Sequence, residues 1–196
     1  GEVSDVRKVV SPVMVNEPKS SFYHIDFSFD HLRLGGSAFA QTRNCIGDDV
    51  PTVANPEYFA EAFDAVQQLV KEGLVMAGHD VSAGGLITTL LEMCFANTTG
   101  GMEIDLNNVV EKDIVKLLFA ENPALVIQVA DKDKCRMQAI LDDAGICFVK
   151  IGTPCAKRHI AVAKNRRTRL FDIDHYRDVW FDSSYLMDLK QSFNGC

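Results

Sequence analysis

The sequence LVMAGHDVSAGGLITTLLEMCFA occupies residues 74–96 of the 196-residue chain and contains its most informative pattern. Two apolar runs are separated by a polar turn that holds Asp80, Ser82, Gly84 and Gly85. The first run is short and typical of a buried strand, whereas the second repeats apolar residues over a wide helical face. The stretch therefore predicts a strand, a glycine-rich turn and a helix packed on both sides, which is a unit of an α/β fold.

Strand and helix patterns alternate along the rest of the chain, without an internal repeat. We expect an extended lead-in at residues 1–20 and one α/β domain at residues 21–196, with a mixed β-sheet of about six strands flanked by helices. The predicted strands cover 20–30, 74–77, 101–106, 124–130, 146–152, 159–163 and 168–174. The predicted helices cover 57–71, 111–119, 132–144 and 175–193, with one more from residue 86 and a short one after Ser37.

Side-chain periodicity predicts which faces of these elements are buried. Residues 20–30 alternate between polar and apolar side chains, so the strand is expected to bury one face. Its apolar set is Tyr23, Ile25, Phe27 and Phe29. The apolar set of the helix at 57–71 recurs at helical spacing and consists of Phe59, Phe63, Val66 and Val70.

The composition of the chain indicates which classes of partner and compartment to expect. The formal net charge is −7, which argues against binding of nucleic acid, since that needs a basic face. No apolar stretch reaches the roughly 20 residues of a membrane span. Six cysteines contain no CxxC pair, so we expect reduced thiols and a cytoplasmic protein. The chain has no initiator methionine, and we expect it to be a fragment of a longer protein.

The polar turn in 74–96 has two interpretations. As a phosphate site, Asp80 would bind Mg²⁺, Ser82 would contact a phosphate, and Gly84 and Gly85 would let the anion approach the N–H groups at a helix start. As a structural turn, Asp80 and Ser82 would cap the helix, and the glycines would allow close packing. The residues alone leave both interpretations open.

A second glycine pair precedes the short helix, in RLGGSAFAQ at residues 33–41. Gly35, Gly36 and Ser37 would form another anion cradle, and two cradles suit a nucleotide because it has several phosphates. This prediction requires the two loops to lie close together in the fold. Glu121, just before the strand at 124–130, is interpreted as a turn cap.

Six motifs occur in an order that resembles one enzyme family. They are RLGGSAFAQ, GDDVPTV, GHDVSAGGLITTLLEMCFA, GMEIDL, LFAENPALVIQV and VWFDSSYLMDLKQ. Together they resemble phosphoribosylformylglycinamidine synthase, and within it the last AIR-synthase-like C-terminal domain of the large single-chain form, before the glutaminase domain. Trp180, Ser184 and Tyr185 in the last motif favour this domain over an earlier one of the same enzyme.

The resemblance implies the fold of an AIR-synthase C-terminal domain. It also implies a role as part of a C–N ligase in purine biosynthesis, which converts formylglycinamide ribonucleotide to formylglycinamidine ribonucleotide with ATP and glutamine. It implies ATP or ADP with Mg²⁺ as cofactors, with Asp80 as metal ligand and Ser82 as nucleotide contact. The implied partners are the AIR-synthase N-terminal-like domains and the glutaminase domain. No catalytic residue is expected here, and the isolated fragment should be inactive.

Two alternatives remain beside this interpretation. One is another member of the superfamily, such as AIR synthetase, selenophosphate synthetase or thiamine-monophosphate kinase. The other is a structural domain that binds no ligand. The chain also departs from the family pattern at Pro123 and Ala124, and at Ala83, where an acid is common; Glu121 fits the pattern.

Overall fold

A seven-stranded mixed β-sheet forms the centre of the computed structural model, which describes residues 5–193. The strand order is β2-β4-β1-β5-β3-β6-β7, and all neighbours are antiparallel except the parallel pair β3–β6. The strands are β1 (Ser20–Asp26), β2 (Ala77–Val81), β3 (Gly101–Asp105), β4 (Ala124–Ala130), β5 (Phe148–Cys155), β6 (His159–Lys164) and β7 (Arg167–Asp172). The predicted α/β fold is thus confirmed, and all seven strands lie in one sheet, for which about six were expected. Residues 1–4 of the predicted lead-in and 194–196 of the predicted domain lie outside the described residues.

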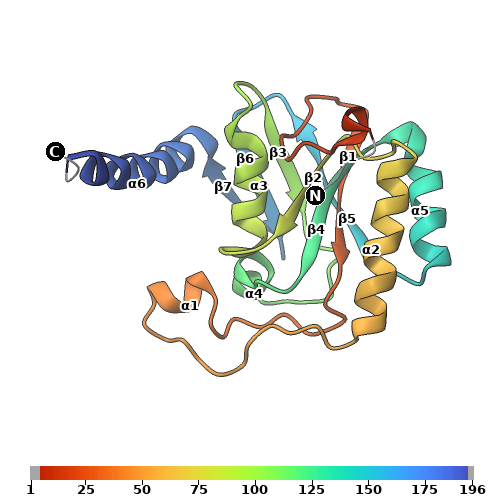
Figure 1. Ribbon diagram of the computed structural model, residues 1–196, viewed down its shortest axis with the longest axis horizontal. Coiled ribbons are helices and arrows are strands. Elements are labelled where there is room, and N and C mark those ends of the chain that lie inside the picture. Colours follow the sequence, from red (N-terminus) through yellow and green to blue (C-terminus); the bar gives the residue numbers. More distant parts are fainter. Residues whose placement is uncertain (1–4, 194–196) are drawn as a thin grey trace.

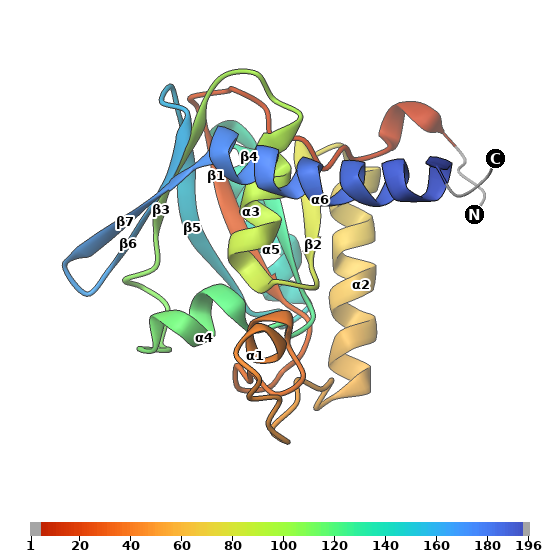
Figure 2. The same ribbon diagram turned by 90° about the vertical axis from the view of Figure 1, so that its left-hand side faces the viewer.

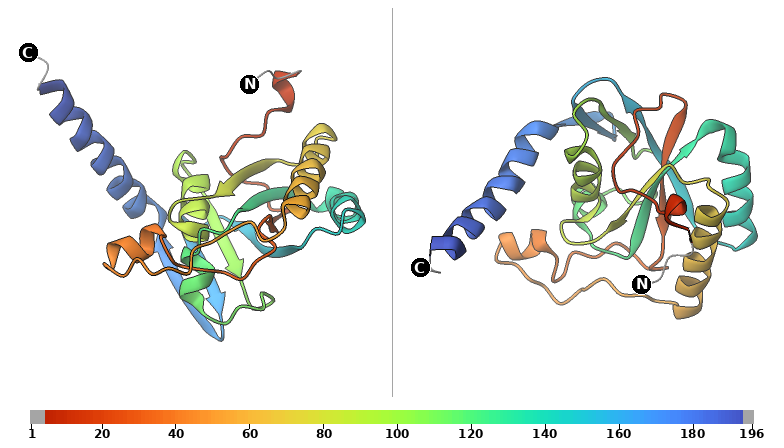
Figure 3. Two further views of the ribbon diagram at one scale, coloured as in Figure 1. Left: turned by 60° about the horizontal axis from the view of Figure 1, so that its bottom comes forward. Right: turned by 45° about the horizontal axis from the view of Figure 1, so that its top comes forward.

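Helices cover both faces of the sheet (Figures 1 and 2). Helices α3 (Gly85–Phe95) and α4 (Ile114–Phe119) bury one apolar core, whereas α2 (Pro56–Lys71) and α5 (Lys134–Asp143) bury another on the opposite face. The remaining helices are α1 (Ala38–Thr42), α6 (Ile173–Phe193) and the short 3₁₀ turns η1 (Val6–Lys8) and η2 (Asp131–Asp133). Helix α6 packs against α3 and then extends away from the sheet (Figure 3).

Strand β1 is buried on both faces, so the prediction of a single buried face was wrong. Phe22 packs in the α3/α4 core, while Tyr23 and Ile25 pack in the α2/α5 core. Pairing with β4 and β5 makes β1 a central strand, and helices cover it on each side. Phe29, predicted to be buried, lies beyond the strand with 55% exposure.

The apolar face of α2 also differs from the prediction. Asn55 caps the helix through its Oδ1 atom, which accepts from the Tyr58 N–H at 3.0 Å. Phe59 and Phe63 are exposed, and the buried face lies one residue away; it comprises Tyr58, Ala62, Ala65, Val66 and Leu69. Two alanines on this face let α2 approach the sheet closely, which the pattern of large apolar residues did not indicate.

The strand predicted at 74–77 begins three residues later, at Ala77. The Leu74 N–H bonds to the Leu69 carbonyl, which closes the end of α2, so the apolar run leads into β2 instead of forming it. Strand β2 is an edge strand, and for that reason it accommodates the polar residues His79 and Asp80.

The predicted lead-in packs onto the domain. Met14 is buried in the α3/α4 core, and its N–H donates to the Met93 carbonyl at 2.9 Å. Residues 6–8 form η1 instead of an extended segment. Within residues 5–193, no helix is long and apolar enough to cross a membrane.

Candidate functional site

The two predicted glycine loops converge on one carboxylate. Oε1 of Glu121 accepts hydrogen bonds from the Gly84 N–H at 2.7 Å and from the Ala38 N–H at 2.8 Å. Gly84 is the N-cap of α3, and Ala38 is the first residue of α1. Segments about 45 residues apart in the sequence therefore lie a hydrogen bond's length from the same oxygen atom. We refer to Ala38, Gly84 and Glu121 as the Glu121 junction.

The glycines of the α3 turn are required by packing. Gly84 and Gly85 have φ values of 89° and 72°, in the left-handed region that favours glycine. A Cβ atom on Gly85 would lie 2.7 Å from the Leu118 carbonyl oxygen and from the Phe119 backbone. The end of α4 thus approaches the start of α3 closely, and the Gly85 N–H is bonded to the Ser82 carbonyl at 2.9 Å.

The N–H groups of the second glycine loop also have acceptors within the chain. Gly35 donates to the Asp49 carbonyl at 2.9 Å, and Gly36 donates to the Ile46 carbonyl at 2.8 Å. Ser37 is buried, and its hydroxyl oxygen caps α1 by accepting from the Ala40 N–H at 3.2 Å. In this conformation the loop is closed on itself, and a phosphate would compete with these bonds.

Asp80 and Ser82 are the predicted site residues with accessible side chains. The Asp80 carboxylate is 67% exposed, and Ser82 is exposed beside it. Mg²⁺ is commonly held by one or two carboxylates with water and phosphate oxygens, so a single exposed carboxylate fits a phosphate-bridged ion. The neighbouring His79 faces α3, where its Nε2 lies 3.3 Å from Oε2 of Glu92. The Nδ1 atom of the same imidazole lies 3.4 Å from Oδ1 of Asp80, so the His79 ring lies between the carboxylates of Glu92 and Asp80.

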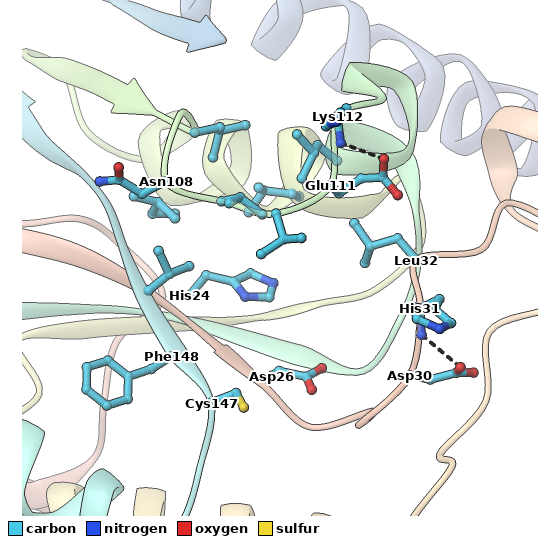
Figure 4. A pocket seen from close by; sticks show the side chains of 17 residues that line it. His24, Asp26, Asp30, His31, Leu32, Asn108, Glu111, Lys112, Cys147 and Phe148 are labelled. Carbon is cyan, nitrogen blue, oxygen red and sulfur yellow. Dashed lines mark hydrogen bonds between the residues drawn. The ribbon is translucent and has the colours of Figure 1, made fainter. Parts of the chain in front are cut away.

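A cavity of about 690 Å³ lies beside the start of α3, between β1, β5 and the segment before α4 (Figure 4). This volume is within the range of about 300–1,000 Å³ that is typical of small-molecule sites. Its polar lining residues include His24 and Asp26 from β1 and Asp30 and His31 from the following loop. Asn108, Glu111 and Lys112 from the segment before α4 add further polar groups. Burial lowers the pKa of His24 and the Asp26 carboxylate opposes this shift, so the imidazole is neutral near pH 7. The cavity suits a small ligand with both polar and apolar parts.

Sequence reasoning missed Asn122, which holds the loop that lines one side of this cavity. Asn122 is buried, and its Oδ1 accepts from the Arg33 N–H at 3.1 Å while its Nδ2 donates to the His31 carbonyl at 3.0 Å. It thus fixes the loop after β1 from a position next to Glu121. An asparagine beside a glutamate before a buried strand was the only available signal, and it does not identify a partner 90 residues away.

Residues 26–165 match the family model described as AIR synthase related protein, C-terminal domain. The chain belongs to this family. Within it, human phosphoribosylformylglycinamidine synthase is 34% identical over 197 residues, covering 98% of this chain and 15% of the human protein. The probable chloroplastic/mitochondrial enzyme of the same name from Arabidopsis thaliana is 32% identical over 198 residues, covering 98% of this chain and 14% of that protein.

The fold of the family is also seen in a solved structure of T. maritima PurL complexed with ATP. It aligns with a TM-score of 0.66 over 86% of this chain and 27% of the PurL chain. The sequence identity is 13%, so this likeness shows the fold alone. The resemblance inferred from the motifs is confirmed by the two relatives, and the chain spans about 15% of their length.

Proposed function

We propose that the chain is one domain of a phosphoribosylformylglycinamidine synthase. The observation that carries this proposal is the 34% identity to the human enzyme across 98% of the chain. The whole protein would use ATP to activate the amide oxygen of formylglycinamide ribonucleotide, and ammonia from glutamine would then displace the phosphate. The N-terminal-like and glutaminase domains would lie outside these 196 residues.

Within that enzyme, we propose that the rim formed by Asp80, Ser82 and the α3 turn contributes to a nucleotide–Mg²⁺ site. The support is threefold: the Asp80 carboxylate is exposed, the Ser82 hydroxyl is free for a phosphate, and the α3 N-terminus carries a partial positive charge. Gly84 and Gly85 would supply the turn that holds these groups. Gly35, Gly36 and Ser37 would support the turn through the Glu121 junction, and they would reach the nucleotide only if their internal hydrogen bonds open.

ADP or ATP would serve as a structural or catalytic ligand at this rim, since PurL from T. maritima has been solved with ATP. We further propose a cytoplasmic location, which is consistent with five free thiols among the described cysteines. Those thiols fit a reducing compartment.

Purified full-length protein tests the proposed activity. With formylglycinamide ribonucleotide, glutamine, ATP and Mg²⁺, we expect one ADP for each formylglycinamidine ribonucleotide formed. The 196-residue chain alone, supplied with ammonia in place of glutamine, should give no product. ATP turnover that needs formylglycinamidine ribonucleotide as substrate would instead assign the protein to the AIR synthetase alternative, and the proposal would be wrong.

A further inference from the structure

Three metal-ligating side chains meet on a part of the sheet far from the Glu121 junction. They are Glu103 on β3, Cys155 at the end of β5 and His159 at the start of β6. Strand β3 lies between β5 and β6 in the sheet, so the three residues come from three adjacent strands. Within the described part of the chain, no other three His, Cys, Asp or Glu side chains gather as closely.

The register of the strands explains why these side chains meet. Cys155 lies opposite Gly101, and Met102 lies opposite Ile160, which places His159 on the other side of Gly101. Met102 and Ile160 point into the α3/α4 core, so alternation directs the three ligand side chains to the opposite face. Gly101 has no side chain there, and a Cβ atom would clash with the His159 carbonyl oxygen. The close approach at this glycine brings His159 next to Cys155.

The distances suit one metal ion. The three ligand atoms all lie within 4.8 Å of one another, and Nε2 of His159 is 3.5 Å from Oε1 of Glu103. Metal–ligand bonds of about 2.0–2.3 Å in a tetrahedral site place ligand atoms roughly 3.3–3.7 Å apart. Small side-chain rotations are therefore enough to bring the sulfur, nitrogen and oxygen atoms to a common centre.

These side chains are available for a ligand. Cys155 is a free thiol whose Sγ donates a weak hydrogen bond to the Lys157 carbonyl at 3.5 Å. The Glu103 side chain is 53% exposed and that of His159 is 23% exposed, so solvent reaches the cluster. The ligands are also carried by β-strands of a rigid sheet, which keeps the arrangement preorganised.

The donor set selects the metal. Thiolate, imidazole and carboxylate together suit Zn²⁺, whereas Mg²⁺ prefers oxygen ligands alone. Two anionic ligands balance the two positive charges of the ion. We propose that Glu103, Cys155 and His159 form a Zn²⁺ site with three protein ligands, whose fourth position is open to water. Zinc bound there links β5, β3 and β6 and stabilises this end of the sheet.

Metal titration of the full-length protein tests this inference. After removal of metals with a chelator, we expect one high-affinity Zn²⁺ per chain, and Co²⁺ should give a thiolate-to-cobalt charge-transfer band in the near ultraviolet. Cys155→Ser should abolish that band. Loss of a residue that only hydrogen-bonds to a metal ligand typically weakens metal binding by about 10- to 100-fold, so His159→Gln or Glu103→Gln, which each remove a ligand, should weaken Zn²⁺ binding by more than this. Cys135→Ser, an exposed cysteine on α5, is the matched control and should leave both readouts unchanged.

Glu103 lies on the surface, so Glu103→Gln leaves both apolar cores unchanged and a loss of Zn²⁺ binding would not reflect unfolding. Circular dichroism of each variant verifies that the sheet is intact. No tight Zn²⁺ binding by the unmodified protein would overturn the inference. A cobalt band that persists in Cys155→Ser, or that disappears equally in Cys135→Ser, would overturn it as well.

Discussion

Replacement of Glu121 by alanine should loosen two loops at once. The substitution removes the acceptor of the Gly84 and Ala38 N–H groups. A hydrogen bond to a charged group contributes about 1.5–3 kcal/mol, so two such bonds at a half-buried carboxylate contribute about 3 kcal/mol. For a protein of this size, that loss lowers Tm by about 6–12 °C. Glu121→Gln keeps an acceptor oxygen without the charge, and its effect should be about half as large.

Two measurements on the same variants separate this effect from general destabilisation. Thermal unfolding followed by circular dichroism gives the change in Tm, and amide hydrogen exchange reports on Ala38 and Gly84 individually. Glu61→Ala on the exposed face of α2 is the control and should change stability by less than about 0.5 kcal/mol. If Ala38 and Gly84 keep their protection in Glu121→Ala, the carboxylate does not hold the two loops, and the reasoning fails.

Three further outcomes are expected. Gly85→Ala should lower Tm more than Gly145→Ala, because both have positive φ but only Gly85 would clash with neighbouring backbone; equal losses would contradict this. Hydrogen bonds from Arg136 lower the pKa of Glu72 to about 2, so the ion pair contributes stability that is complete above about pH 4.5 and is lost as the pH falls toward 2. An NMR titration should show that midpoint, and Arg136→Ala should raise it. Burial raises the pKa of Cys94 to about 12, so iodoacetamide at pH 8 should label the exposed cysteines and spare Cys94, as mass spectrometry can verify.

Local sequence patterns predicted the elements whose burial can be read from their own residues. The segment 124–130, which is apolar except for Gln128, became β4 with the predicted bounds, because a run of this composition is typical of a buried strand. The pattern at 20–30 was ambiguous, since Phe22 and Ile25 are buried on opposite faces of β1. The position of β1 at the centre of the sheet depends on pairing with β4 and β5, whose residues lie about 100 positions or more away in the sequence.

In the candidate site, too, local motifs could be predicted from the sequence, whereas contacts between distant segments could not. A local motif indicated Asp80, Ser82 and Gly84 as candidate site residues, and the family resemblance implied the same roles for Asp80 and Ser82. The contact that joins the two loops involves Glu121, and its partners cannot be recognised from spacing. The same holds for Glu103 and Cys155, which are brought together only by the register of β3 and β5.

The direct test of the nucleotide site is nucleotide and magnesium retention by full-length Asp80→Asn protein. The substitution keeps the shape of the side chain and removes its charge, and Asp64→Asn on the exposed face of α2 is the matched control. We expect a loss of one charge-assisted contact of about 1.5–3 kcal/mol, which is on the order of 10- to 100-fold in affinity. Added ADP with Mg²⁺ should raise the Tm of the unmodified and Asp64→Asn proteins but not that of Asp80→Asn. If Asp80→Asn retains nucleotide and Mg²⁺ at the unmodified stoichiometry and affinity, the rim at β2 does not bind the metal, and the glycine-rich turn is structural.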